Sequence, residues 1–431
     1  MKLGIMLYFF DFRNDIRRLL VELNNYYQIV IFVRKEHEET VKAHIPENME
    51  YRIINERKAG IYTPILEKVY FLLRKLPKSR QNYYLMEEFK KGNIENLKIR
   101  KKANFLLTLH RWLPHIISYD LYLKLIAVSK KTQIDDITTF LCLTEIYDDH
   151  LFSRIIKEHK NNFIYVYSWD HAFKHTRFSK KAEYLVWSES IKDDLINIQQ
   201  INSNKIHVTG STQLSYLFNF KNNIKESTFP KPYYYYGCGI GILSLIDKEI
   251  ALVQKISEAI KRINKNAVLV VRPYPNNKNW EKYKILNNYT NIILDDNFRQ
   301  KDLSVSDSDI YQKFQNISGA LAFFHIGTTL GLEVCHTNCP SFIINIEADN
   351  HKRLNVFNFV NQYQNKKYLI DQSESNTINS VEDLEKAISN TTNARYMELN
   401  LKIRSQFPVQ SFQQIGAAIA NTIGGNNNKP G

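Results

Sequence analysis

The chain has 431 residues, of which 44% are hydrophobic and 24% charged, which is an ordinary globular composition. A chain of this length exceeds the size at which one hydrophobic core stops growing, so we expect two domains. No apolar run reaches the roughly 18 residues of a membrane-spanning helix, and four scattered cysteines exclude a disulfide framework. Because the N-terminus lacks a cleavable signal pattern, we expect a cytoplasmic protein.

The net charge of +14 is unevenly distributed along the chain. Residues 74–102 contain ten Lys or Arg and three Glu, so this segment carries half of the net positive charge of the chain. A Trp-bearing run with helical apolar spacing follows over 105–125. Such a pair can dock on anionic lipid at the inner face of the cytoplasmic membrane, or it is a solvated face followed by a core helix. The sequence shows no nucleic-acid module, so we expect no nucleic-acid partner.

Short apolar runs alternate with helical or polar sequence in the first half, which is typical of a parallel α/β sheet. The expected strands are 3–10, 29–33, 138–143, 163–167, 184–187 and 206–208. A helical, basic insertion over about 59–131 interrupts this pattern. The polar, Asn- and Lys-rich residues before Pro230 and Pro232 indicate a linker over 216–232, so the first domain is expected to span 1–215.

A second α/β unit is expected over 233–423, before a disordered tail over 424–431. Its expected strands are 233–236, 268–271, 292–294, 320–324 and 342–344. The turn Gly237-Cys238-Gly239-Ile240-Gly241 after the first of them is either a phosphate cradle or a plain tight turn, because GxGxG differs from the dinucleotide fingerprint. The fold class is thus two Rossmann-like, doubly wound domains with a cleft between them.

Two apolar runs of the second half end abruptly, at Arg272 and at His325, as buried parallel strands do where they open into a ligand crevice. Arg272 either grips a phosphate or pairs with Asp295 or Asp296. The threonine-rich turn after His325 either offers backbone N–H groups to phosphate or simply caps a helix, and Glu333 could accept hydrogen bonds from ribose hydroxyls. The residues expected to bind a nucleotide are Gly237, Gly239, Gly241, Arg272, Tyr274, His325, Gly327, Thr328, Thr329 and Glu333.

Asp170 and His171 follow an expected strand of the first domain, and a positioned carboxylate can take a proton from a hydroxyl group. Asp170 is the first candidate base, His171 the second, and Glu145 or Asp149 the third. The alternative for Asp170 is a helix cap or an ion pair with Lys174 or Arg177. The residues expected on the acceptor side of the cleft are Asp11, Arg13, Ser211 and Thr212. The alternative for Ser211 and Thr212 is a plain strand-to-loop turn.

We expect no metal and no cofactor. Cys335, His336 and Cys339 lack a second ligand pair at zinc-like spacing. Asp307-Ser308-Asp309 precedes a helix and is expected to cap it.

Three segments resemble a motif series of bacterial GT-B-type glycosyltransferases that build surface polysaccharide such as capsule or O-antigen. They are Ser168-Trp169-Asp170-His171, Val186-Trp187-Ser188-Glu189 and His207-Val208-Thr209-Gly210-Ser211. Arg272-Pro273-Tyr274-Pro275 is similar to the R/K-P-H-P element of capsule, sialyl and glycerophosphate transferases, and His325–Thr329 to their phosphate loop. Tyr274 stands where that element carries His, and His171 where the series carries Asn, so the resemblance leaves the donor open.

This resemblance implies a metal-independent glycosyltransferase with a nucleotide-sugar as co-substrate and a lipid-linked or polysaccharide acceptor. Nucleotide-sugar 2-epimerases share the architecture and are the first alternative, although their soluble substrates leave the basic insertion unexplained. A non-catalytic glycan- or lipid-binding scaffold is the second alternative.

Overall fold

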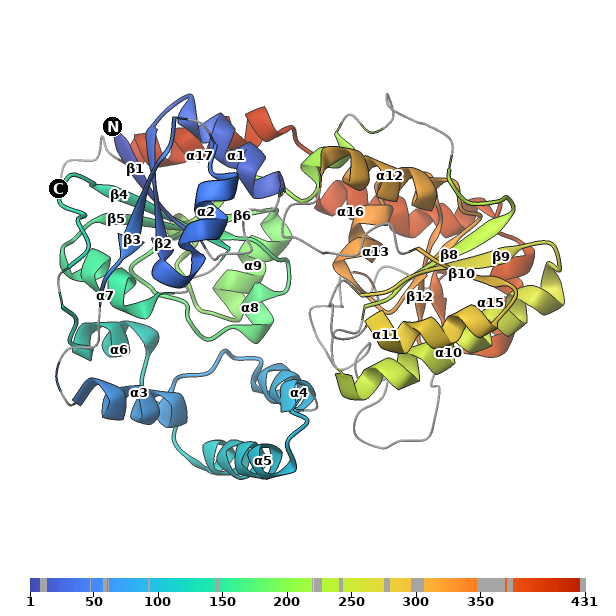
Figure 1. Ribbon diagram of the computed structural model, residues 1–431, viewed down its shortest axis with the longest axis horizontal. Helices are drawn as coiled ribbons and strands as arrows, with labels where there is room; N and C mark the ends of the chain where they lie inside the picture. Colours follow the sequence, from blue (N-terminus) through green and yellow to red (C-terminus); the bar gives the residue numbers. More distant parts are fainter. Residues whose placement is uncertain are drawn as a thin grey trace. The chain divides into compact units, whose positions relative to one another are not determined.

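The structure is a computed structural model with two compact units (Figure 1). It describes all residues except 8–13, 47, 57–59, 61, 92–93, 130, 145–147, 219, 221–226, 240–242, 275–279, 296–305, 347–368, 370–374 and 427–431. The first unit comprises Met1–Tyr83, Asn104–Ser215 and Val409–Gly431, and the second comprises Tyr84–Ala103 and Tyr216–Pro408.

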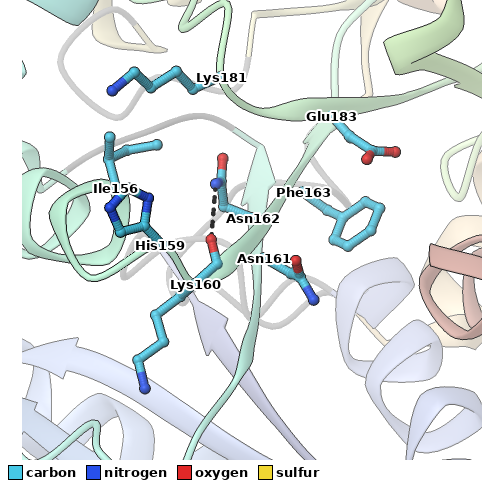
Figure 2. A pocket seen from close by; sticks show the side chains of 8 residues that line it. All are labelled: Ile156, His159, Lys160, Asn161, Asn162, Phe163, Lys181 and Glu183. Atoms are coloured by element: carbon cyan, nitrogen blue, oxygen red, sulfur yellow. Dashed lines mark hydrogen bonds between the residues drawn. The ribbon is translucent and has the colours of Figure 1, made fainter. Parts of the chain in front are cut away.

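The described part of the first unit contains a parallel sheet with the strand order β3-β2-β1-β4-β5-β6-β7. The strands are β1 (Lys2–Met6), β2 (Gln28–Arg34), β3 (Glu50–Ile54), β4 (Thr139–Thr144), β5 (Asn161–Val166), β6 (Glu183–Val186) and β7 (Ile206–Val208). In β2 every residue from Ile29 to Val33 is buried, which explains its unbroken apolar run, since the sheet is covered on both faces. A pocket of about 410 Å³ opens at the amino ends of β5 and β6 (Figure 2).

Helices alternate with the strands of this sheet along the chain, as the sequence predicts. They are α1 (Asn14–Asn24), α2 (Glu38–His44), α7 (Asp149–Lys157), α8 (His171–Lys174) and α9 (Glu189–Asn197). The last helix of the chain, α17 (Phe412–Asn426), packs against α1 and belongs to the first unit. Sequence analysis placed this segment in the second domain, and it assigned residues 424–426 to a disordered tail although they are helical.

The described residues of the insertion between β3 and β4 form four helices: α3 (Tyr62–Leu73), α4 (Arg80–Lys91), α5 (Leu97–Trp112) and α6 (Tyr119–Leu125). Within it, Tyr84–Ala103 belong to the second unit and the rest to the first. α6 packs on α7 and on α3, where the rings of Tyr70 and Tyr122 stack with centroids 4.1 Å apart. A parallel bridge joins Arg74 to Ile117. Among the described residues, none of the helices combines the length and the hydropathy needed to cross a bilayer.

The second unit also has a parallel sheet, with the described strands in the order β10-β9-β8-β11-β12-β13. These are β8 (Tyr233–Gly237), β9 (Val268–Arg272), β10 (Ile292–Leu294), β11 (Phe323–His325), β12 (Ser341–Ile344) and β13 (Thr377–Ile378). Its helices are α10 (Leu243–Ile263), α11 (Trp280–Tyr283), α12 (Asp307–Ser318), α13 (Thr329–Val334), α15 (Val381–Ser389) and α16 (Glu398–Gln406). Part of the expected linker packs on this unit, since Thr228 donates to Asn316 of α12 and Phe220 contacts Phe314.

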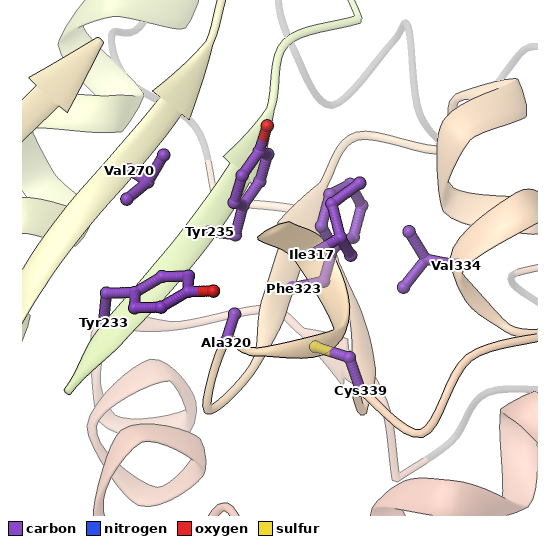
Figure 3. Close-up of a cluster of buried hydrophobic side chains, with 8 residues drawn as sticks. All are labelled: Tyr233, Tyr235, Val270, Ile317, Ala320, Phe323, Val334 and Cys339. Carbon is purple, nitrogen blue, oxygen red and sulfur yellow. The ribbon is translucent and has the colours of Figure 1, made fainter. Parts of the chain in front are cut away.

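All four tyrosines of β8 are buried, and each hydroxyl has a partner. Successive side chains of a strand point to opposite faces, so Tyr233 and Tyr235 lie on one face of the sheet. There they pack with Val270, Phe323 and neighbouring apolar side chains (Figure 3). The hydroxyls reach groups at the edges of this core, which is how a tyrosine is accommodated in a buried strand.

The predicted fold class, two doubly wound α/β units with parallel sheets, is confirmed. The cleft expected between the units stays a prediction. Two edge strands, β3 and β13, were missed. β3 is mostly half-buried and β13 has two residues, so neither produces a continuous apolar run.

Candidate functional site

The strand order of the second sheet reverses between β8 and β11, and doubly wound sheets bind ligands at the carboxyl ends of such strands. The loops after these two strands are in close contact. A Cβ atom built on Gly239 would lie 2.1 Å from Cγ2 of Thr328 and 3.1 Å from Cγ1 of Ile326. A Cβ on Gly237 would lie 2.6 Å from the ring of Phe323. Glycine is therefore required for this approach, while Gly241 lies outside the described residues.

A buried carboxylate holds the first of these loops. Glu249 of α10 is fully buried, and its Oε1 accepts hydrogen bonds from the Gly239 N–H at 2.8 Å and the Tyr236 hydroxyl at 3.2 Å. The Tyr283 hydroxyl donates to Oε2 at 2.9 Å. Burial, followed by the nearby Glu249 charge, raises the pKa of both tyrosines well above its usual value. Sequence analysis missed Glu249, although an acid on the apolar face shared by Ile246 and Val253 was a signal.

Arg272 ends β9 and is buried beside Asp295, which follows β10. Its Nη1 lies 3.5 Å from Oδ2 of Asp295, and the Tyr235 hydroxyl donates to the same oxygen. The other oxygen of Asp295 is buried without a hydrogen-bond partner. The ion pair that was the alternative for Arg272 is thus present, and it fixes the guanidinium at the strand end. Tyr274 lies two residues further on and is exposed.

His325 is fully buried and faces the protein interior. Its Nδ1 accepts the N–H groups of Gly327 at 2.9 Å and Thr328 at 3.3 Å, and its Nε2 lies 3.1 Å from the Ser341 hydroxyl. A Cβ on Gly331 would lie 2.1 Å from the ring. The N–H groups of Gly327 and Thr328 are thus bonded within the turn, in which Gly327 has a φ of 79°, and His325 shapes this turn. That these residues bind a phosphate stays a prediction.

Thr328 caps α13, since its Oγ1 accepts the Gly331 N–H at 3.1 Å. Thr329, the first residue of the helix, is half-buried. One turn on, Glu333 is largely buried and its Oε2 lies 2.8 Å from the Lys313 ammonium group. This turn therefore has the form of the alternative given for it, a capped helix that packs on the sheet. Glu333 is held by an ion pair.

In the first unit, Asp170 and His171 lie after the carboxyl end of β5 and are half-buried. Asp170 occupies the cap position of α8 without a capping hydrogen bond, and the Ser168 hydroxyl donates to its Oδ1 at 2.6 Å. The His171 ring meets the His175 ring edge-on, with centroids 4.6 Å apart. The guanidinium of Arg177, an alternative partner of Asp170, lies 3.6 Å from Asp149.

Ser211 and Thr212, which were expected on the acceptor side, are both buried, and that role stays a prediction. The Thr212 hydroxyl donates to Asp15 at 2.8 Å and its N–H donates to Tyr165 at 2.9 Å, so this loop ties β7 to α1. The remaining expected residues of this unit, Asp11, Arg13 and Glu145, lie outside the described residues.

The pocket of Figure 2 lies at the amino ends of β5 and β6, whereas Asp170 follows the carboxyl end of β5. Its lining comprises Ile156, His159, Lys160, Asn161, Asn162, Phe163, Lys181 and Glu183. Glu183 is paired with His207 at 2.7 Å. Ligands of doubly wound sheets bind at the carboxyl ends, so this pocket is not the candidate site. Within the described ranges, no cluster of His, Cys, Asp and Glu is arranged to hold a metal ion.

Comparison with solved structures finds the same architecture. A candidate UDP-N-acetylglucosamine 2-epimerase from Listeria monocytogenes is 10% identical, with 100% of this chain and 97% of that chain covered and a TM-score of 0.51. A co-structure of S. aureus MnaA with UDP is 9% identical, with 99% and 96% covered and a TM-score of 0.51. A glycosyltransferase from Rickettsia africae ESF-5 is 11% identical over 99% of both chains, but its TM-score of 0.45 is too low to support a conclusion about this chain.

No protein-family model matches the sequence, and no curated protein does. At these identities the structural likeness concerns the fold alone. Two Rossmann-like units, each with a parallel sheet whose order reverses once, fit the GT-B fold.

Proposed function

We propose that the protein is an enzyme that acts on a nucleotide-sugar, with the nucleotide bound at the switch point between β8 and β11. The observation that carries this proposal is the contact between the β8 and β11 loops, where Gly239 leaves no room for a side chain beside Thr328. The Gly239 backbone thereby packs against the Thr328 side chain. Gly239 lies two residues after Gly237, the strand partner of Arg272, at the edge where such sheets bind phosphate-bearing ligands. The UDP in the printed descriptions of both structures with a TM-score of 0.51 favours a uridine nucleotide.

The reaction proposed first is glycosyl transfer to a lipid-linked or polysaccharide acceptor in surface glycan synthesis. Asp170 is the proposed base, because its carboxylate is held by Ser168 at a strand end and is not used as a helix cap. Neither a metal nor a cofactor takes part in this proposal. The protein is proposed to work in the cytoplasm, in peripheral contact with the membrane that carries the acceptor.

A nucleotide-sugar 2-epimerase is the second candidate. It is favoured by the description of the Listeria structure, which covers nearly the whole chain. The insertion of α3 to α6 favours the transferase, since an epimerase with a soluble substrate has no need of a basic, apolar surface.

The first test is a thermal-shift screen of purified protein against UDP, GDP, CMP, CDP and dTDP and the sugars linked to them. A ligand at a hundredfold excess over its Kd stabilises by about 2.7 kcal/mol, which such a screen detects. We expect a shift with uridine nucleotides that Arg272→Gln and Tyr274→Ala weaken. Arg262→Gln, at an exposed arginine paired with Glu385, is the matched control and should keep the shift. No shift with any nucleotide would overturn the proposal.

The second test separates the two reactions. Protein is incubated with the stabilising UDP-sugar alone, and the sugar is followed by NMR for inversion at C2. A parallel sample contains a membrane lipid extract, and UDP release is measured. UDP release that needs the extract supports transfer, whereas a new 2-epimer without any extract supports the epimerase.

A further inference from the structure

The helical insertion exposes large apolar side chains at a higher density than the rest of the described chain. Among the described residues 21 large hydrophobic side chains are exposed, and 11 of them lie between Tyr62 and Leu125. This segment also contains the basic surplus of residues 74–102. Isolated exposed apolar residues are normal, but such a concentration marks an interaction surface.

Two strongly exposed aromatic side chains lie on one face of α5. Phe105 and Trp112 are 68% and 85% exposed, and because they are seven positions apart they lie on the same face, about two turns from each other. Leu107 and His110, the buried residues of this helix, lie on the opposite face. Lys98 and Lys101, seven and four positions before Phe105, are exposed on the aromatic face.

We propose that this face of α5, with Phe105 and Trp112 as anchors and Lys98 and Lys101 beside them, docks on an anionic lipid bilayer. Aromatic side chains insert at the headgroup level, and lysines pair with lipid phosphates. α3 presents a second exposed apolar row, Tyr62, Ile65 and Val69, at helical spacing. Docking through this face would bring an enzyme with a lipid-linked acceptor to the membrane that carries the acceptor. Only this role rests on the proposed function; the docking itself does not.

Other occupants fit this face less well. A second copy of the chain would bring the lysines of both copies together, and like charges repel. Single-stranded nucleic acid would use the aromatic rings and lysines, but it gains nothing from the exposed aliphatic side chain of Leu97 beside them. A bilayer of anionic lipid uses all three kinds of side chain.

The test is sedimentation of the full chain with phosphatidylcholine vesicles that contain or lack phosphatidylglycerol. We expect partitioning only with phosphatidylglycerol, and weaker partitioning at higher salt. Lys98→Gln/Lys101→Gln should lower the partition coefficient roughly 25-fold, about fivefold for each charge. Phe105→Ala/Trp112→Ala should lower it on the order of a hundredfold. Lys261→Gln/Lys265→Gln, which removes two exposed lysines at the end of α10 and beyond it, should bind as the parent chain does.

Trp112 also provides a direct readout of insertion. Lipids brominated on the acyl chains should quench the emission of Trp112, and Trp112→Phe, which keeps the other three tryptophans, tests this assignment. Trp112→Phe should keep vesicle binding and lose this quenching. Circular dichroism and thermal midpoints equal to those of the parent chain exclude misfolding of the variants.

Equal partitioning of the parent chain and both α5 variants would overturn the proposal. Binding that an RNA oligonucleotide competes away, without quenching by brominated lipid, would overturn it in favour of nucleic acid. The assay contains no nucleotide, and the thermal-shift screen contains no lipid, so either proposal can fail while the other stands.

Discussion

The ammonium group of Lys313 lies 2.8 Å from a carboxylate oxygen of Glu333, and both side chains are largely buried. This ion pair joins α12 to α13 behind the turn that follows β11. Lys313 also lies over the Phe314 ring, 4.1 Å from its centroid. The pair therefore fixes the carboxylate that sequence analysis assigned to ribose hydroxyls.

We expect Lys313→Met to destabilise the protein, because it leaves the Glu333 carboxylate without its cation. The cost should be roughly 2 kcal/mol, below the 3–5 kcal/mol of a fully buried pair. Lys313→Met/Glu333→Leu should recover much of this loss, as measured by urea unfolding. The exposed pair Arg262 and Glu385 serves as the control, and its coupling should stay under about 1 kcal/mol. A double variant no more stable than the single one would contradict this account.

Gly239→Ala should abolish nucleotide binding with a small loss of stability. The new methyl group would lie 2.1 Å from Cγ2 of Thr328, so the β8 loop must move away from the β11 loop. Isothermal titration with the nucleotide found in the screen measures the loss. Gly425→Ala, where a Cβ meets nothing within 4 Å, should leave binding unchanged. Unchanged binding by Gly239→Ala would place the nucleotide elsewhere.

Most strands of both sheets could be predicted from the sequence because parallel strands covered on both faces produce continuous apolar runs. The run from Ile29 to Val33 is an example. The unit to which α17 belongs could not be predicted in this way. Its amphipathic pattern shows that it has a buried face, but not that α1 is what buries it.

The polar residues of the candidate sites were located correctly at strand ends, but their partners were not predictable. His325 bonds to Ser341 and Thr212 bonds to Asp15, which is 197 positions away. Such pairings depend on the order of strands in the sheet, which spacing along the chain does not specify. Asp170 differs, because one of its partners, Ser168, is only two positions away.

Asp170→Asn should lower turnover by roughly 10²- to 10⁴-fold, the usual contribution of a general base. The thermal shift with nucleotide should persist, since this residue lies in the first unit and the nucleotide site in the second. Ser168→Ala removes the hydrogen bond at 2.6 Å to Oδ1 and should have a smaller effect on kcat. Asp193→Asn, at an exposed acid of α9, is the matched control. Full turnover by Asp170→Asn would move the role of base to His171.

The insertion should lose stability in mild acid because of His110. Burial, then the nearby Arg74 and His115, lowers the pKa of His110 from 6.5 to about 4. The unfolded chain therefore binds more protons than the folded chain between these values. The stabilisation is complete above pH 6.5 and is lost as the pH falls toward 4, by at most about 1.4 kcal/mol per pH unit for each proton. Limited proteolysis within α3 to α6 across this range measures the effect, and His110→Gln should flatten the pH dependence. His336, whose pKa burial also lowers to about 4, lies in the second unit, whereas His110, α3 and α6 lie in the first. His336→Gln should therefore leave the pH dependence of cleavage within α3 and α6 as steep as in the parent chain.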